Sequence, residues 1–379
     1  MSIIFEIIIG LLILVALVVA HEWGHAMAAI RSGVVVEEFG IGLPPTGWRK
    51  KLKNGIELTL NWLPLGGYVK LQGEYDSASK KGDYGAATFG QKTKILLAGV
   101  TVNWVVAAIL LTILSLTGMP RVIENQFFIA NDTYKVSQQV EVVGLTKNHP
   151  AGEAGIKVGD KIIRFAGKEV PTPAKLIELA ESNKGKEIEV IYTRKGAENN
   201  VKLTLGDTGE GGYFGASLGQ RELIRSTWSA PIIGVATTAQ FTWATLEGTG
   251  NLFANLFSGL IFQFSPDSDV RKEASSELNS ASESVAGPIG IIGTIFPQAQ
   301  EAGMTQLVFL TAIISLSLAV MNILPIPALD GGRWLLMTIY KLRHKKLTRE
   351  REEKAQAIGF YVLMGLIVLV TVVDVSRII

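Results

Sequence analysis

Long apolar runs are the first pattern in the chain. Four segments are almost free of charge over most of the length that a helix needs to cross a bilayer, about 20 residues. They are Ile3–Ala20, Ile95–Met119, Leu307–Leu324 and Ile358–Val373. The pattern predicts a polytopic α-helical membrane protein with four transmembrane helices.

The first run also has some features of a secretory signal peptide, because Val18-Val19-Ala20 offers small or medium residues for cleavage. It lacks the usual basic residues at its start and is longer than the apolar part of a typical signal peptide. We therefore interpret it as a retained transmembrane helix.

Lysine and arginine are concentrated in two of the connecting segments. Nine of these residues lie from Arg31 to Lys92, and seven lie from Arg333 to Arg351, whereas the first six residues contain none. Basic loops favour the cytoplasmic side. The distribution predicts that both loops are cytoplasmic and that both termini are extracytoplasmic.

Alternation of apolar and polar residues marks a small β-hairpin or sheet between the first two runs. Ile56–Trp62 alternates at every step, and Val34–Val36 and Tyr68–Leu71 also have strand character. One interpretation is a membrane-associated sheet that only packs. The other is an exposed edge that pairs with an extended substrate, since a transmembrane helix must unwind before its peptide bonds are accessible.

A soluble α+β domain is predicted for residues 120–219, with a helix at Pro173–Ser182. Strands are expected at Val140–Leu145, Lys161–Phe165, Glu187–Thr193 and Val201–Leu205. The run from His149 to Val170 resembles the PDZ domains of bacterial membrane and periplasmic proteases, in a single copy. That resemblance implies a loop at Tyr213, Phe214, Gly215 and Ala216 whose backbone N–H groups receive a peptide carboxylate. We expect His149 to be a surface turn residue.

Residues 226–262 combine aromatic residues with Thr, Gly and Asn and carry almost no charge. This composition favours one or two helices at the outer membrane interface over a buried soluble helix. Ser265–Ser284 is rich in Ser, Asp and Glu, and we expect an exposed loop there.

Composition narrows the choice of function. With 48% hydrophobic residues and a mean hydropathy of +0.31, the chain is more apolar than an ordinary soluble protein. A net charge near +2 gives no global field that would indicate nucleic acid as a partner. The absence of Cys leaves His, Asp and Glu as metal ligands.

The motif His21-Glu22-Trp23-Gly24-His25 stands at the end of the first apolar run. On a helix its two histidines lie one turn apart on one face, so both imidazoles can bind one Zn²⁺, and Glu22 can deprotonate a water molecule there. A polar helix end that happens to carry two histidines is the alternative. It explains neither the spacing nor the apolar setting, because ionisable groups at membrane depth are costly.

A catalytic zinc site usually has a third protein ligand. The candidates are Glu37, Glu38, Asp76, Asp83 and Asp330. Asp330 follows the third apolar run, which ends at the same cytoplasmic depth as His21. Two prolines before it and two glycines after it suit either a ligand turn or an ordinary helix-ending turn. The matched depth favours Asp330 as the ligand.

Four motifs together closely resemble the site-2 protease family of intramembrane zinc metalloproteases, and the bacterial regulator-of-sigma-E protease branch in particular. They are His21–His25, Leu63–Lys70, Gly287–Gly290 and Asn322–Gly332. The branch proper has two PDZ domains, and here one PDZ-like copy is visible. The resemblance implies a zinc metalloendopeptidase with Zn²⁺ held by His21, His25 and Asp330.

The resemblance also implies further residue roles. Glu22 would be the catalytic general base, and Asn322 and Asn103 would bind the substrate backbone. Val100 stands where the family tends to have Pro, and Arg333 stands where many relatives have His.

The predicted function is regulated intramembrane proteolysis at the bacterial plasma membrane, with the active site toward the cytoplasm. Its substrates would be single-span proteins such as anti-sigma factors or remnant signal peptides, trimmed first by a site-1-type protease. One alternative is a membrane-anchored zinc peptidase that cleaves cytosolic or misfolded segments outside the bilayer. The other is a non-catalytic PDZ-bearing scaffold, which the presence of Glu22 disfavours.

The expected boundaries follow from these segments. They are 1–30 for the first span with the zinc motif, 31–92 for the hairpin region, 93–119 for the second span, 120–219 for the PDZ-like domain, 220–303 for the interfacial helices and loop, 304–330 for the third span with the third ligand, 331–356 for the basic cytoplasmic loop and 357–379 for the fourth span.

Overall fold

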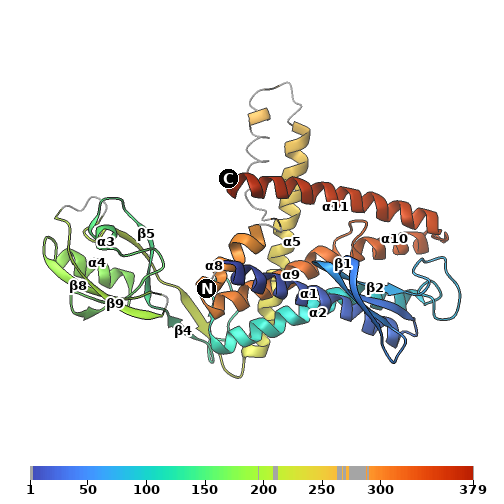
Figure 1. Ribbon diagram of the computed structural model, residues 1–379, viewed down its shortest axis with the longest axis horizontal. Helices are drawn as coiled ribbons and strands as arrows, with labels where there is room; N and C mark the ends of the chain where they lie inside the picture. The colour runs from blue at the N-terminus through green and yellow to red at the C-terminus, as the bar shows by residue number, and fades with distance from the viewer. Residues whose placement is uncertain are drawn as a thin grey trace. The chain divides into compact units, whose positions relative to one another are not determined.

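A computed structural model describes residues 3–194, 196–207, 212–262, 267, 270–272, 287 and 290–378 (Figure 1). The chain forms two compact units. The first comprises residues 1–111, 234–300 and 307–379, and the second comprises residues 112–233 and 301–306. Most of the loop expected at Ser265–Ser284 lies outside the described residues.

Three helices of the described chain are long and apolar enough to cross a membrane: α1 (Ile3–Arg31), α2 (Phe89–Thr117) and α9 (Met304–Ile323). They confirm the first three apolar runs as candidate spans. The fourth run lies within α11 (Arg349–Ile378), a 30-residue helix that is not among these three. A fourth span therefore stays a prediction.

Further helical segments of the described chain include α5 (Ala230–Phe262), the π-helix η1 (Ile291–Ile295), α8 (Phe296–Glu301), α10 (Asp330–Leu342) and, in the second unit, α4 (Pro173–Ser182). α5 is one continuous helix of 33 residues where one or two were expected. Its expected place at the membrane interface stays a prediction.

The hairpin between the first two spans consists of two long antiparallel strands, β1 (Val36–Lys51) and β2 (Glu57–Leu71). The alternating pattern located it but underestimated its length. Its glycines allow close contacts: a Cβ at Gly40 would clash with the ring of Tyr68. Tyr68 and Thr59 both donate hydrogen bonds to the Glu38 carboxylate, over 2.6 and 2.9 Å, which ties the two strands together.

The second unit contains an antiparallel sheet in the order β10-β5-β6-β8-β9, with β7 paired to β6. The strands are β5 (Val140–Leu145), β6 (Lys161–Phe165), β7 (Lys168–Glu169), β8 (Glu187–Arg194), β9 (Ala197–Thr204) and β10 (Ala216–Gly219). All four predicted strands and the predicted helix α4 are present. α4 begins after Thr172, whose hydroxyl accepts a hydrogen bond from the Lys175 N–H and so caps the helix.

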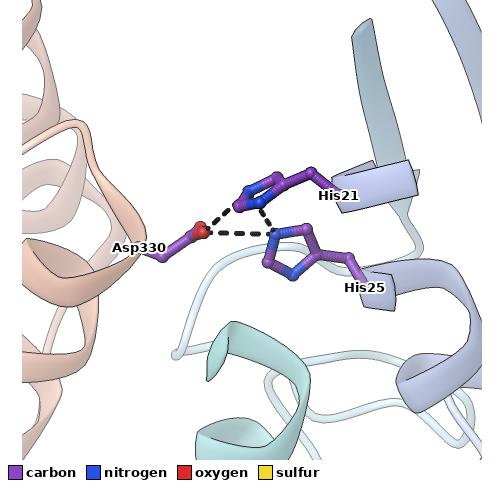
Figure 2. Close-up of side chains that lie close together, drawn as sticks. All are labelled: His21, His25 and Asp330. Carbon is purple, nitrogen blue, oxygen red and sulfur yellow. Dashed lines mark hydrogen bonds and ion pairs between the residues drawn. The ribbon is translucent and has the colours of Figure 1, made fainter. Parts of the chain in front are cut away.

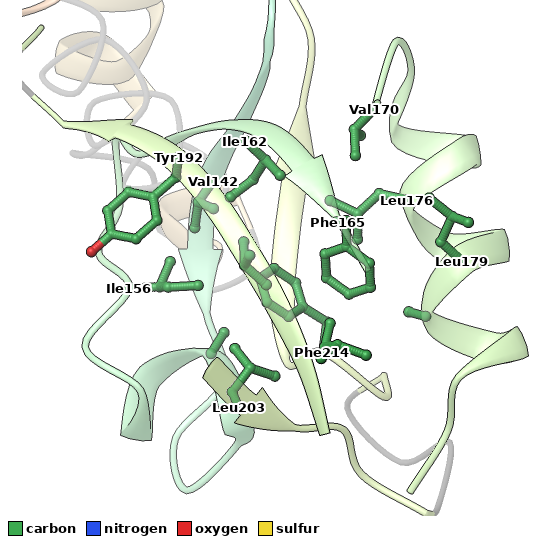
Figure 3. Packing of buried hydrophobic residues seen from close by; sticks show 14 of the residues in the cluster. Val142, Ile156, Ile162, Phe165, Val170, Leu176, Leu179, Tyr192, Leu203 and Phe214 are labelled. Atoms are coloured by element: carbon green, nitrogen blue, oxygen red, sulfur yellow. The ribbon is translucent and has the colours of Figure 1, made fainter. Parts of the chain in front are cut away.

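One hydrophobic core fills the space between this sheet, α4 and the short helix α3 (Pro150–Glu153) (Figure 3). Phe165 and Phe214 meet edge to face at its centre, with ring centroids 5.1 Å apart. A separate small sheet pairs β11 (Glu222–Arg225) with β3 (Met119–Pro120) and β4 (Tyr134–Ser137). The sequence patterns did not predict this second sheet, because its strands have two to four residues.

Candidate metal centre

The two histidines of the motif share one face of α1. His21 and His25 are buried, with exposed fractions of 7% and 9%, and their ring centroids are 4.7 Å apart. The helix continues past both residues to Arg31. Helical spacing therefore brings the imidazoles together, as the motif predicted.

Asp330 comes from a different element. α9 ends at Ile323, a turn with two prolines follows, and Asp330 is the first residue of α10. The expected span of 304–330 thus contains a break, since proline interrupts the helical hydrogen bonds. Gly331 and Gly332 permit the turn, because a Cβ at either residue would clash with the backbone of residues 323–327.

Three ligand atoms converge between these elements (Figure 2). His21 Nε2 and His25 Nε2 are 3.1 Å apart, and each lies 3.2 Å from Asp330 Oδ2. Tetrahedral zinc with bonds of 2.0–2.1 Å would separate its ligand atoms by about 3.3 Å. The triangle therefore fits Zn²⁺, which would relieve the crowding of three electron-rich atoms.

Two contacts orient the imidazoles. His25 Nδ1 lies 2.8 Å from the Ile95 carbonyl oxygen, and donation to that oxygen directs the Nε2 lone pair toward the centre. Gly99 of α2 faces both rings, and a Cβ there would clash with His25 Nε2. Gly99 had no role in the predictions made from the sequence. A glycine inside an apolar helix, opposite a metal motif, is the signal that could have found it.

Glu22 lines a cavity of about 230 Å³ together with all three ligands and Asn322. Val69 of β2 lines the same cavity, and a Cβ at Gly67 would lie 3.3 Å from Glu22 Cγ, so β2 lies against the expected general base. Asn322 keeps one amide hydrogen bond within its helix, from Nδ2 to the Leu318 carbonyl oxygen at 2.9 Å. The structure thus brings Glu22 and Asn322 to the metal centre.

Asn103 lies elsewhere. It is fully buried in α2, its side chain has no hydrogen-bond partner in the described chain, and it is not among the residues that line the cavity. Ser315 of α9 donates a hydrogen bond of 2.9 Å to its backbone carbonyl. Val100 leaves α2 continuous through this region. A substrate-binding role for Asn103 stays a prediction.

The other candidate third ligands have different partners. Glu37 pairs with Lys70 and Asp76 with Lys92, while Asp83 accepts a hydrogen bond from Gln72. Within the described ranges, His21, His25 and Asp330 are the one group of three such side chains with metal-ligand spacing.

A buried ion pair lies beside the centre and was not predicted. Arg333 contacts the Glu352 carboxylate at 3.0 Å, donates to the Glu74 backbone carbonyl and stacks 4.7 Å from the ring centroid of Tyr84. Burial raises the pKa of Tyr84, although Arg333 opposes the shift. A second cavity of about 430 Å³ adjoins the first and shares Glu74, Arg333 and Asp330 with it.

The expected peptide-carboxylate loop belongs to the second unit. Phe214 is in the hydrophobic core, Gly215 has a positive φ of 76° and Ala216 begins the edge strand β10. The carbonyl oxygens of Phe214 and Gly215 accept hydrogen bonds from Ala151 and Thr146. His149, expected to be a surface turn residue, is half-buried before α3, and its Nδ1 lies 2.9 Å from the Lys147 carbonyl oxygen. Peptide binding at this loop stays a prediction.

Comparisons with known proteins agree with the metal centre. The model of peptidase family M50 matches residues 9–366. A Clostridium perfringens protein with zinc metalloprotease in its name is 30% identical over 369 residues, 97% of this chain and 98% of that protein. Zinc metalloproteases named RasP from Geobacillus kaustophilus and Bacillus licheniformis are 25% and 26% identical, with coverage of 96% or more of each chain.

One solved structure is also similar to part of the chain. It is the PDZ domain of the SdrC-like protein from Listeria monocytogenes, with 20% identity and a TM-score of 0.20. The match covers 21% of this chain and 86% of that structure.

Proposed function

Because this chain belongs to peptidase family M50, we propose that it hydrolyses peptide bonds within or near the transmembrane segment of single-span membrane proteins. It is a zinc metalloprotease with helices suited to a membrane. The observation that carries the proposal is the position of the metal centre. Its histidines lie in an apolar candidate span, and Asp330 closely follows another.

Zinc, when bound, supplies a Lewis acid that polarises the scissile carbonyl and lowers the pKa of water toward neutrality. His21, His25 and Asp330 would hold it. Glu22, in the same cavity, would accept a proton from the attacking water and later transfer it to the leaving amine. β2, which lies against Glu22 at Gly67, would hold the carboxylate in place for both transfers.

Unwound substrate needs backbone partners near this cavity. β2 lies against α1, with Gly67 next to Glu22, and Asn322 presents its amide from the opposite element. We propose that an extended substrate segment lies along β2 and that Asn322 binds its backbone. This interpretation supports a role for the hairpin beyond packing.

The distribution of basic residues supports a topology with both termini outside the cytoplasm and four spans, the fourth in α11. In that topology the metal centre lies toward the cytoplasmic side of a bacterial plasma membrane, and the PDZ-like domain lies outside. That domain would admit substrates already trimmed by a site-1-type protease. Anti-sigma factors and remnant signal peptides are the proposed substrates.

Substitution of Glu22 by Gln tests the proposal. Gln keeps the shape of the side chain but cannot accept the proton, so the Glu22→Gln protein should retain zinc and lose cleavage of a tagged single-span substrate. A Glu37→Gln protein is the matched control, because Glu37 pairs with Lys70 on the hairpin. Undiminished cleavage by Glu22→Gln would reject the assigned role.

A further inference from the structure

A third hollow lies between α1 and α2, separate from the metal cavity. Its volume is about 430 Å³, and it shares no lining residue with the cavity that contains the ligands. Trp23 and Met27 of α1 and Leu97 and Val102 of α2 form its apolar walls. A volume of this size is in the usual range for small-molecule sites.

Small residues create the hollow. The two helices approach so closely at Gly24 that a Cβ there would lie 2.7 Å from the Ala98 carbonyl oxygen. Ala28 and Ala98 also line the space and fill little of it. The hollow opens on a different face of α1 from the histidines, since Trp23 follows His21 by about 200° around the helix.

Two cations stand at one end of the hollow. Arg31 is the last residue of α1, and Lys94 is in the second turn of α2. Neither forms an ion pair with any residue in the described part of the chain. By contrast, nearby Lys92 pairs with Asp76. The two positive charges of the hollow therefore have no counter-charge among the residues that the structure describes.

The polar groups of the hollow also differ between its two ends. Thr93, next to Lys94, accepts a hydrogen bond from Trp334, so its hydroxyl hydrogen remains available to an acceptor. Thr101, deeper in the span, donates its hydroxyl hydrogen to the Leu97 carbonyl. One end can bind an anion, and the other offers apolar surface.

We propose that this hollow binds one anionic phospholipid. Its phosphate would lie between Arg31 and Lys94, and an acyl chain would lie against Leu97 and Val102. Trp23, which is 53% exposed, would pack beside the chain. A lipid fits better than a soluble anion because the apolar walls belong to two candidate spans, and basic pockets between spans favour anionic headgroups.

Lipid binding to the full-length protein tests the proposal by native mass spectrometry, with phosphatidylglycerol and phosphatidylcholine compared at equal concentration. Each cation near a headgroup contributes roughly fivefold to affinity, so Arg31→Gln with Lys94→Gln should weaken phosphatidylglycerol binding by about 25-fold. Lys345→Gln with Lys346→Gln is the matched control, since it removes two exposed cations outside the hollow. The control should bind as the unmodified protein does.

A second variant tests the space inside the hollow without changing its charge. Ala28→Phe fills the hollow without removing a cation and should also reduce bound phosphatidylglycerol, while zinc content reports that the fold is intact. Equal binding of phosphatidylcholine, unchanged binding by the double Gln variant, or equally tight binding of free glycerol phosphate would each overturn the proposal. Displacement of the lipid by a substrate's transmembrane peptide would also overturn it, since the hollow would then be a helix-binding site.

Discussion

Replacement of Arg333 by Met should weaken the metal centre without touching a ligand. Arg333 lies three residues after Asp330 in the first turn of α10, and its guanidinium contacts Glu352 of α11 at 3.0 Å. The side chains of the pair are 16% and 2% exposed. Glu352 also accepts a hydrogen bond of 2.9 Å from the Asp76 N–H. The pair thus connects α10, α11 and the segment after β2.

The size of the expected loss of stability follows from the burial of the pair. Removal of one partner leaves the Glu352 carboxylate buried and unpaired, which costs about 3–5 kcal/mol of stability. An exposed ion pair contributes about 0–1 kcal/mol. Arg349 and Glu353 form such a pair, with side chains 66% and 45% exposed, so Arg349→Met is the matched control.

Two measurements check this expectation. Arg333→Met should lower the unfolding midpoint well below that of Arg349→Met and should weaken zinc affinity by about tenfold, because a mobile first turn of α10 no longer fixes Asp330. Replacement of both Arg333 and Glu352 by Met should recover part of the stability, since no unpaired charge then remains. Equal midpoints and equal zinc affinities for Arg333→Met and Arg349→Met would refute the reasoning.

Three further outcomes are expected. Gly99→Ala should lower the stability of the fold by about 1–3 kcal/mol and lower the zinc content, because the added Cβ would clash with His25 Nε2. Gly90→Ala is the control, since a Cβ at Gly90 has nothing within 4 Å and should change neither. Metal analysis compares the two variants. Removal of zinc by a chelator should abolish proteolysis, and added Zn²⁺ should restore it. Desolvation raises the pKa of Asp132, but hydrogen bonds from Ser229 and Thr227 outweigh it and hold that pKa below its ordinary 3.8. The stabilising effect of the ionised Asp132 carboxylate should therefore be complete above about pH 4 and should fall in stronger acid, as hydrogen exchange would show. Asp132→Asn should remove this pH dependence.

The sequence predicted the elements that repeat a simple pattern. Spacing on one helix determined that His21 and His25 share a face, and period-two alternation located the hairpin and four of the strands of the second unit. Asp330 was identified because its depth matched that of His21. These features depend on local periodicity or on the length of an apolar run, which a single sequence contains.

Contacts between distant segments were harder to predict. The break at Ile323 and the start of α10 at Asp330 depend on how Gly331 and Gly332 pack against the preceding turn. The pairing of Arg333 with Glu352 depends on where α11 crosses α10. No spacing rule relates these residues, because only the tertiary structure brings them together.

The position of the cut in a substrate tests intramembrane proteolysis most directly. The zinc-loaded protein in lipid vesicles would be incubated with a tagged single-span substrate, and the products would be weighed by mass spectrometry. We expect a cut within the apolar segment or at its edge, and no cut by the Glu22→Gln protein. A cut many residues outside the apolar segment would contradict intramembrane proteolysis and favour a membrane-anchored peptidase.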